Sequence, residues 1–266
     1  MLGVSLPDRL SQRVGLTTIA LAVTGVFAAP ASADLVPGLG MSWDVTNDGL
    51  PQMDFQPDAG QVWATPDGSY HYRGAMRSPA WELDWDCAVR TGNAESRTGP
   101  QYVDAFIQVT NNSANTETFF LLMTVSGIAP VAPSSIIDGS VDATVTDQSA
   151  NGFAQLSAPS GGSVYSAYVD LVDVNTDAPV ATLMDDGYAL TTNQFLGTAN
   201  DGASFLPSPG PSASTSISIL LKFTLSPGDS ASVSGIFTIE AVPGPGVLMV
   251  FGTFGVGLGR RRRQDW

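Results

Sequence analysis

The stretch that decides the fold lies near the end of the chain. Residues 217–225 read ISILLKFTL, residues 226–229 read SPGD, and residues 230–239 read SASVSGIFTI. Apolar residues or glycine occupy every second position on both sides of SPGD, and this period of two places one face of a strand in a core. Pro227 and Gly228 stand where a type II turn needs a fixed negative φ and then a positive φ. The pattern predicts two antiparallel strands joined as a β-hairpin.

The same alternation recurs upstream. Trp81, Leu83, Trp85 and Cys87 share one face of a predicted strand, with acidic residues between them. Further strands are predicted over residues 102–110, 116–126, 137–146 and 164–174, and a slip of phase at Val172 predicts a β-bulge in the last of them. Residues 178–210 are predicted to be rich in loops, with weaker strands at 180–184 and 188–192. Because no segment of residues 34–240 shows a sustained helical period, the sequence predicts an all-β fold, an antiparallel β-sandwich or jelly roll.

The N-terminus has the features of an export signal. Arg9 and Arg13 precede an apolar run at residues 16–27, and Ala31 and Ala33 supply the small residues of a cleavage site. This arrangement predicts a secretory signal peptide over residues 1–33, which is read by the secretion translocon and cleaved after Ala33. An uncleaved N-terminal anchor is the alternative. The predicted mature domain covers residues 34–240.

The C-terminus has the features of a membrane segment. Residues 241–259 carry no charge, and the next four residues are Arg260, Arg261, Arg262 and Arg263. As a helix, this uncharged run would span about 28 Å, close to the hydrocarbon thickness of a bilayer. An arginine cluster directly after it is typical of a cytoplasmic membrane edge. The sequence therefore predicts a transmembrane helix over residues 246–259, and a buried C-terminal helix or strand of a soluble domain is the alternative.

A short proline motif precedes this run, formed by Val242, Pro243, Gly244 and Pro245. With the apolar segment and the arginine cluster, it resembles the C-terminal sorting signal of PEP-CTERM proteins, in which Glu usually stands at the place of Gly244. The resemblance covers residues 241–266 and implies an exported bacterial protein that an exosortase cleaves near the two prolines. It also implies transient anchoring in the inner membrane, followed by delivery to the cell surface or the extracellular matrix.

The charge of the predicted mature domain restricts its partners. Residues 34–240 hold 23 acidic and five basic side chains, a formal net charge of −18. Such a surface repels nucleic acid, which is therefore not an expected partner. Cys87 is the only cysteine and His71 the only histidine, so neither an intramolecular disulfide nor a Cys/His metal cluster is expected. Because Cys87 lies in the apolar phase of its strand, its thiol is predicted to be buried and inert.

No catalytic residues are predicted. His71 is accompanied by no Gly-x-Ser-x-Gly elbow that would supply a nucleophile. Glu82, Asp84 and Asp86 offer the carboxylates of a glycosidase. However, three alternating carboxylates are more typical of a solvated strand face, which is the reading favoured here.

Two ligand classes remain as candidates, calcium and sugars. Calcium is the only candidate cofactor, because Asp173, Asn175 and Asp177 have the alternating oxygen ligands of the first half of a calcium loop. Met184 stands where such a loop ends in Glu, and ordinary turn chemistry is the alternative.

Exposed aromatic side chains would serve as stacking platforms for sugar rings. Trp63, Tyr70 and Tyr72 lie in polar, turn-rich sequence and are predicted to be exposed, whereas Trp81 and Trp85 are predicted to lie in the core. The expected function is therefore a non-catalytic structural, adhesive or glycan-binding role, with extracellular polysaccharide as the candidate partner. A secreted hydrolase that acts on polysaccharide is the alternative.

Overall fold

The computed structural model describes residues 37–46, 53–55, 62–92 and 99–242. Two units are distinguished, residues 1–35 and residues 36–266, and all described residues belong to the second. The predicted signal peptide, including Ala31 and Ala33, and the sorting signal from Pro243 onward lie outside the described residues. None of the described segments forms a helix with the length and hydropathy that a bilayer crossing requires.

Every regular element in the described part of the chain is a β-strand, as the alternating sequence predicts. The strands are β1 (Gly38–Val45), β2 (Met53–Phe55), β3 (Val62–Ala64), β4 (Tyr70–Arg77), β5 (Trp81–Arg90), β6 (Gln101–Asn111), β7 (Glu117–Ser126), β8 (Ser135–Thr146), β9 (Ala154–Ser157), β10 (Ser163–Val169), β11 (Ala181–Asp185), β12 (Ala189–Thr192), β13 (Thr198–Gly210), β14 (Ser216–Leu225) and β15 (Ser230–Ala241).

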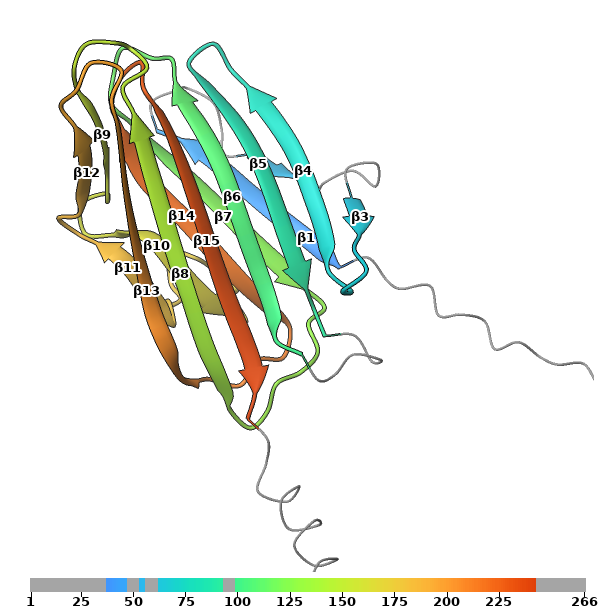
Figure 1. Cartoon of the computed structure of the whole chain (residues 1–266). Coiled ribbons are helices and arrows are strands. Elements are labelled where there is room, and N and C mark those ends of the chain that lie inside the picture. Colours follow the sequence, from blue (N-terminus) through green and yellow to red (C-terminus); the bar gives the residue numbers. More distant parts are fainter. Residues whose placement is uncertain (1–36, 47–52, 56–61, 93–98, 243–266) are drawn as a thin grey trace, which may run out of the picture. The chain divides into compact units, whose positions relative to one another are not determined.

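The strands form two antiparallel sheets in a β-sandwich-like arrangement (Figure 1). Sheet A has the order β11-β10-β14-β7-β1-β2, with β9 joined to β14 and β12 joined to β9. Sheet B has the order β13-β8-β15-β6-β5-β4-β3. The inward phases of both sheets form one hydrophobic core. Its largest fully buried side chains include Trp43, Trp81, Tyr72, Tyr165, Phe119, Phe223 and Phe237.

Tyr165 links the two sheets through the core. It is fully buried on β10 of sheet A, and its hydroxyl donates a 2.9 Å hydrogen bond to the carbonyl oxygen of Ile236 in sheet B. Two glycines make room for the ring and the hydroxyl. A Cβ on Gly139 would lie 2.8 Å from the Tyr165 hydroxyl, and one on Gly235 would lie 3.1 Å from its ring. Gly139 on β8 and Gly235 on β15 thus interrupt the inward-facing apolar side chains of their strands, and the Tyr165 side chain fills the space that they leave.

The predicted C-terminal hairpin is wrong in its pairing, although its strands and turn are confirmed. Gly228 has φ 72°, as the turn requires. However, β14 pairs with β7 and β10 in sheet A, whereas β15 pairs with β6 and β8 in sheet B. The turn thus carries the chain from one sheet to the other. A period of two shows which face of a strand is buried, but it does not distinguish a hydrogen-bonded neighbour from one across the core.

Two further predictions are corrected at the edges of the sheets. The predicted bulge near Val172 is absent from the described strand β10, which ends at Val169 and is followed by Asp170 with φ 51°. Val172 therefore lies in a loop. The predicted loop-rich segment contains the longest described strand, β13, besides the expected β11 and β12. β13 is an edge strand with a register shift between Phe205 and Ser208. It was not predicted because most of its residues are exposed and polar, so its sequence does not alternate between apolar and polar residues.

Asn111 joins the end of β6 to the turn between β14 and β15. Its side chain is fully buried, and its Nδ2 donates to the carbonyl oxygens of Asn115, Leu225 and Ser226 at 2.8, 2.9 and 3.1 Å. Its Oδ1 accepts a 3.0 Å hydrogen bond from the backbone of Ser113. The side-chain amide of Asn111 thus joins the loop after β6 in sheet B to the turn that follows β14 in sheet A.

Replacing Asn111 with Ala should lower the free energy of unfolding by about 1–3 kcal/mol, because buried carbonyls would lose their donor. Urea denaturation followed by tryptophan fluorescence measures the change. Asn112→Ala is the control, since that side chain is exposed. Equal midpoints for the two variants would contradict the role assigned to Asn111.

Candidate ligand-binding site on the outer face of sheet B

A ladder of opposite charges covers the outer face of β4 and β5. Arg73 lies directly across from Asp86, and Arg77 lies directly across from Glu82. Arg73 Nη2 is 3.0 Å from Asp86 Oδ2, and Arg77 contacts Asp84 at 2.7 Å and Glu82 at 3.4 Å. The three carboxylates considered for catalysis are therefore each paired with an arginine. Two arginines thus offset part of the charge of the strand face that the sequence predicted to be solvated.

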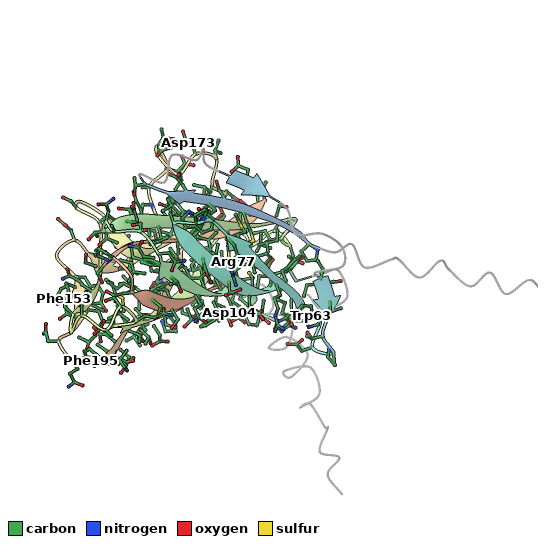
Figure 2. All side chains as sticks on the ribbon, turned by 90° about the horizontal axis from the view of Figure 1, so that it is seen from above. Trp63, Arg77, Asp104, Phe153, Asp173 and Phe195 are labelled. Atoms are coloured by element: carbon green, nitrogen blue, oxygen red, sulfur yellow. The ribbon has the colours of Figure 1, made fainter. Side chains whose placement is uncertain are left out.

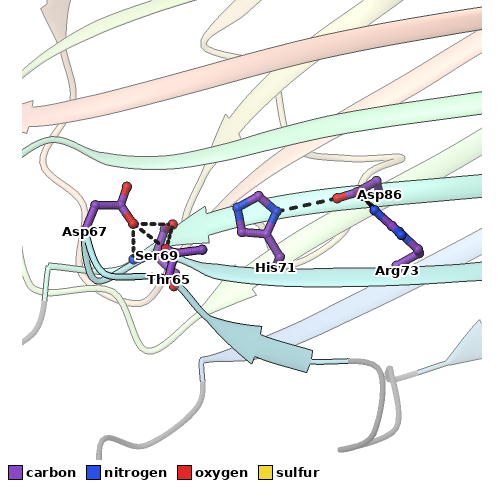
Figure 3. A network of polar contacts seen from close by, with 6 residues as sticks. All are labelled: Thr65, Asp67, Ser69, His71, Arg73 and Asp86. Carbon is purple, nitrogen blue, oxygen red and sulfur yellow. Dashed lines mark hydrogen bonds and ion pairs between the residues drawn. The ribbon is translucent and has the colours of Figure 1, made fainter.

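Trp63 lies over the basic side of this ladder. Its ring stacks on the His71 ring at 5.5 Å with an interplanar angle of 16°, and the Arg73 guanidinium carbon lies 5.4 Å from the Trp63 ring centre. His71 Nδ1 is in turn 3.7 Å from Asp86 Oδ1 (Figure 3). Trp63 remains 42% exposed. The predicted exposure of Trp63 is thus confirmed, and the ring is held in place by two neighbours on β4.

The turn between β3 and β4 places hydroxyls and a carboxylate beside this aromatic residue. Gly68 has φ 81°, which closes the Thr-Pro-Asp-Gly-Ser turn. Asp67 Oδ1 accepts hydrogen bonds from the Thr65 hydroxyl and from the backbone and hydroxyl of Ser69 (Figure 3). These hydrogen bonds lower the pKa of Asp67 to about 2. The turn is therefore stabilised by its own polar side chains, and Asp67 stays ionised at neutral pH.

An open hollow of about 490 Å³ lies next to the turn on the outer face of sheet B. It is lined by Thr65, Pro66, Asp67, Ser69, His71, Ala88, Tyr102 and Asp104. His71, Ala88 and Asp104 form one row across three strands, and Trp63 stands at the end of that row, opposite His71. The lining combines carboxylates, hydroxyls and an imidazole, which are the groups that hydrogen-bond sugar hydroxyls.

Asp104 is the carboxylate of this hollow with a raised pKa. Partial burial raises the pKa of Asp104, the His71 side chain lowers it, and the nearby Asp86 carboxylate raises it again. The residues predicted from the sequence did not include Asp104, Tyr102, Thr65, Asp67 or Ser69. The Thr-Pro-Asp-Gly-Ser turn was a visible signal for three of them, but only the pairing of β4, β5 and β6 brings Asp104 and Tyr102 to the same place.

The other two predicted sugar platforms are corrected. Tyr70 and Tyr72 are buried, because both belong to the inward phase of β4. The Tyr72 hydroxyl donates a 2.6 Å hydrogen bond to the carbonyl oxygen of Pro37 inside the fold. Neither ring is available to a ligand. Cys87, Trp81 and Trp85 are buried, as predicted, and burial raises the pKa of the Cys87 thiol.

The candidate calcium loop is held together by its own hydrogen bonds. Asp177 Oδ2 accepts the backbone N–H groups of Val172 and Asp173, at 2.8 and 3.0 Å. Asp173 Oδ1 accepts the backbone and side-chain N–H groups of Asn175. In the part of the chain that the structure describes, no three Asp, Glu, His or Cys side chains are placed to hold a metal ion. The hydrogen bonds are those of an Asx-type turn, which was the alternative reading.

Comparison with known proteins adds no relative. No protein-family model matches this sequence. No curated protein matches it either.

The pKa shifts of the hollow predict the order in which its carboxylates titrate. On acidification Asp104 should take up its proton first, at a pH above the ordinary value of 3.8, and Asp67 last, near pH 2. The stabilising hydrogen bonds of Asp67 should accordingly persist above pH 3.8 and be lost as the pH falls toward about 2. Carboxyl-carbon NMR resolves each group.

Asp86→Asn tests the contribution of Asp86 to the raised pKa of Asp104, which burial raises more strongly. Removing the neighbouring negative charge should lower the pKa of Asp104, while the pKa of Asp67 should stay where it was, since Thr65 and Ser69 determine it. An unchanged Asp104 titration in this variant would show that the described proximity of the two carboxylates is incorrect.

Proposed function

We propose that this chain is an exported surface protein that binds polysaccharide at Trp63 and the adjacent hollow without cleaving it. The observation that carries the proposal is an exposed tryptophan, fixed by His71 and Arg73, beside a hollow lined with sugar-binding groups. Stacking on an aromatic face and hydrogen bonds from hydroxyls and carboxylates are the two elements of sugar recognition. A shallow, open site suits a chain of sugars better than a small molecule that must be enclosed.

The proposed role is non-catalytic because the obvious carboxylates are already engaged. Glu82 and Asp84 both contact Arg77, and Asp86 contacts Arg73. We therefore propose that Glu82, Asp84 and Asp86 hold the two arginines of the site in place and do not take part in catalysis.

The two chain ends supply the proposed route. We propose that residues 1–33 act as a signal peptide and that residues 241–266 act as a PEP-CTERM-like sorting signal read by an exosortase. The C-terminal helix would anchor the chain in the inner membrane until processing. Strand β15 ends at Ala241, and Val242 donates a 3.4 Å hydrogen bond to the carbonyl oxygen of Ser134. The proline motif thus begins directly after the last strand, where a processing enzyme would leave the domain intact.

A glycan array tests binding, and Trp63→Ala should reduce binding at least about tenfold, the effect of losing a stacked ring worth more than about 1.4 kcal/mol. Phe153→Ala is the matched control, because Phe153 is also 42% exposed but lies at the other end of the sandwich (Figure 2). Equal binding by both variants would refute the site. Turnover of any bound glycan by the wild-type chain would refute the non-catalytic role and support the hydrolase alternative.

Replacing Pro243 and Pro245 together with Ala tests the proposed route. The variant should be exported but retained at the inner membrane with its C-terminal segment uncut. Cell fractionation and mass measurement of the recovered protein detect the difference. Unchanged location and mass relative to the wild type would refute exosortase processing.

A further inference from the structure

Phe153 and Phe195 lie at one end of the sandwich, distant from Trp63 (Figure 2), and both side chains and that of the next residue, Leu196, are exposed. Phe153 ends the loop after β8, and Phe195 and Leu196 lie in the loop before β13. Their exposed fractions are 42%, 70% and 61%. We call these three residues the apolar tip.

One buried carboxylate holds the two loops of the apolar tip together. Asp147 is inaccessible to solvent, and its Oδ2 accepts the backbone N–H of Gly152 at 2.9 Å and that of Leu196 at 3.2 Å. Because one oxygen accepts both, the backbones next to Phe153 and Phe195 are close in space. The backbone N–H of Asp147 also donates to Gly197. The tip is therefore a fixed feature of the fold.

Both loops also carry backbone strain and lack charge. Ala150 and Leu196 have φ values of 57° and 53°, a conformation that side-chain-bearing residues rarely adopt. Strain of this kind is retained where the surroundings enforce it, often at contact sites. Residues 148–153 and 193–197 contain no ionisable side chain, although the predicted mature domain has a net charge of −18. The exposed residues of both loops are thus uncharged, with the carboxylate of Asp147 buried beneath them, and an uncharged tip with exposed apolar side chains on an acidic protein has the composition of a contact surface.

We propose that the apolar tip inserts into the interfacial region of an uncharged or zwitterionic lipid surface. Apolar side chains at a loop end enter the headgroup boundary without a complementary pocket, and the affinity grows with the apolar area buried. The net negative charge of the predicted mature domain favours a lipid surface without net charge. The acidic surface repels anionic headgroups, so a zwitterionic surface is the one that the tip reaches without electrostatic cost.

The exposed area argues against a second copy of the chain as the occupant. The three side chains expose about 300 Å² of apolar surface. In a tip-to-tip contact of two copies these side chains would contribute about 600 Å², whereas a stable protein interface buries about 1,000 Å² or more in total, so the rest would have to come from the polar residues of the loops. A bilayer imposes no such minimum, because each inserted side chain leaves water independently.

The unreactive thiol of Cys87 allows a local test in the intact chain. Because Cys87 is buried and burial raises its pKa, a new cysteine at the surface can be labelled selectively with a polarity-sensitive fluorophore. Phe195→Cys places the label in the tip. Leu206→Cys is the matched control, since Leu206 is 82% exposed but lies about 25 Å along β13 from the tip end. The apolar run at residues 247–259 is present in both variants. Because strand β15 ends beside Ser135, the partner of Gly210, a response caused by this run would favour the label at 206 over the label at 195.

With phosphatidylcholine vesicles, the label at position 195 should show a several-fold rise and a blue shift of its emission, and the label at 206 should not. Adding Phe153→Ser and Leu196→Ser to the labelled chain should remove most of the rise. Equal responses at 195 and 206 would overturn the proposal. A rise without vesicles that grows with protein concentration would instead identify a second copy as the occupant, and a stronger response to phosphatidylglycerol would overturn the lipid class.

Discussion

The burial of one side-chain phase of each long strand in a single core is the constraint on which the rest of the structure depends. Tyr165 makes this visible, because its hydroxyl crosses the core to Ile236 through space left by Gly139 and Gly235. Once the inward phase is committed to packing, the opposite phase must face outward. The charge ladder of β4 and β5 and the row from Trp63 to Asp104 therefore consist of outward-facing side chains. The functional face is thus built from the residues that the core does not use.

Several of the acidic residues have a structural role in loops. Asp67 and Asp177 accept hydrogen bonds within their own turns, and Asp147 joins two loops. Asp170 accepts the consecutive backbone N–H groups of residues 214–216, and although burial alone would raise its pKa, these bonds lower it strongly. Carboxylates that serve as internal anions for backbone amides need no metal and no catalytic role. Asp104 differs from them, because its pKa is raised.

The face proposed to bind sugar and the apolar tip proposed to bind lipid would place two kinds of contact on one fold. Trp63 is fixed by stacking on His71 and Arg73, whereas the tip is fixed by the buried Asp147. Both devices hold exposed side chains in place by local contacts, which reduces the entropy that binding must remove. If both proposals hold, the chain could join polysaccharide to a lipid surface through two contacts on separate parts of its fold.

The sequence by itself determined the all-β class, most strand positions, the turn at Gly228 and the burial of Cys87, Trp81 and Trp85, because a period of two reports directly which side chains leave water. It did not determine that β14 and β15 belong to different sheets, that Tyr70 and Tyr72 point inward, or that β13 is a strand. Those features depend on which strands lie next to each other, and strands that are far apart in the sequence become neighbours only through hydrogen-bond pairing in the folded chain. For the same reason only the tertiary structure brought Asp104 to His71 and Phe153 to Phe195, since the contacts that join them are made between strands and loops far apart in the chain.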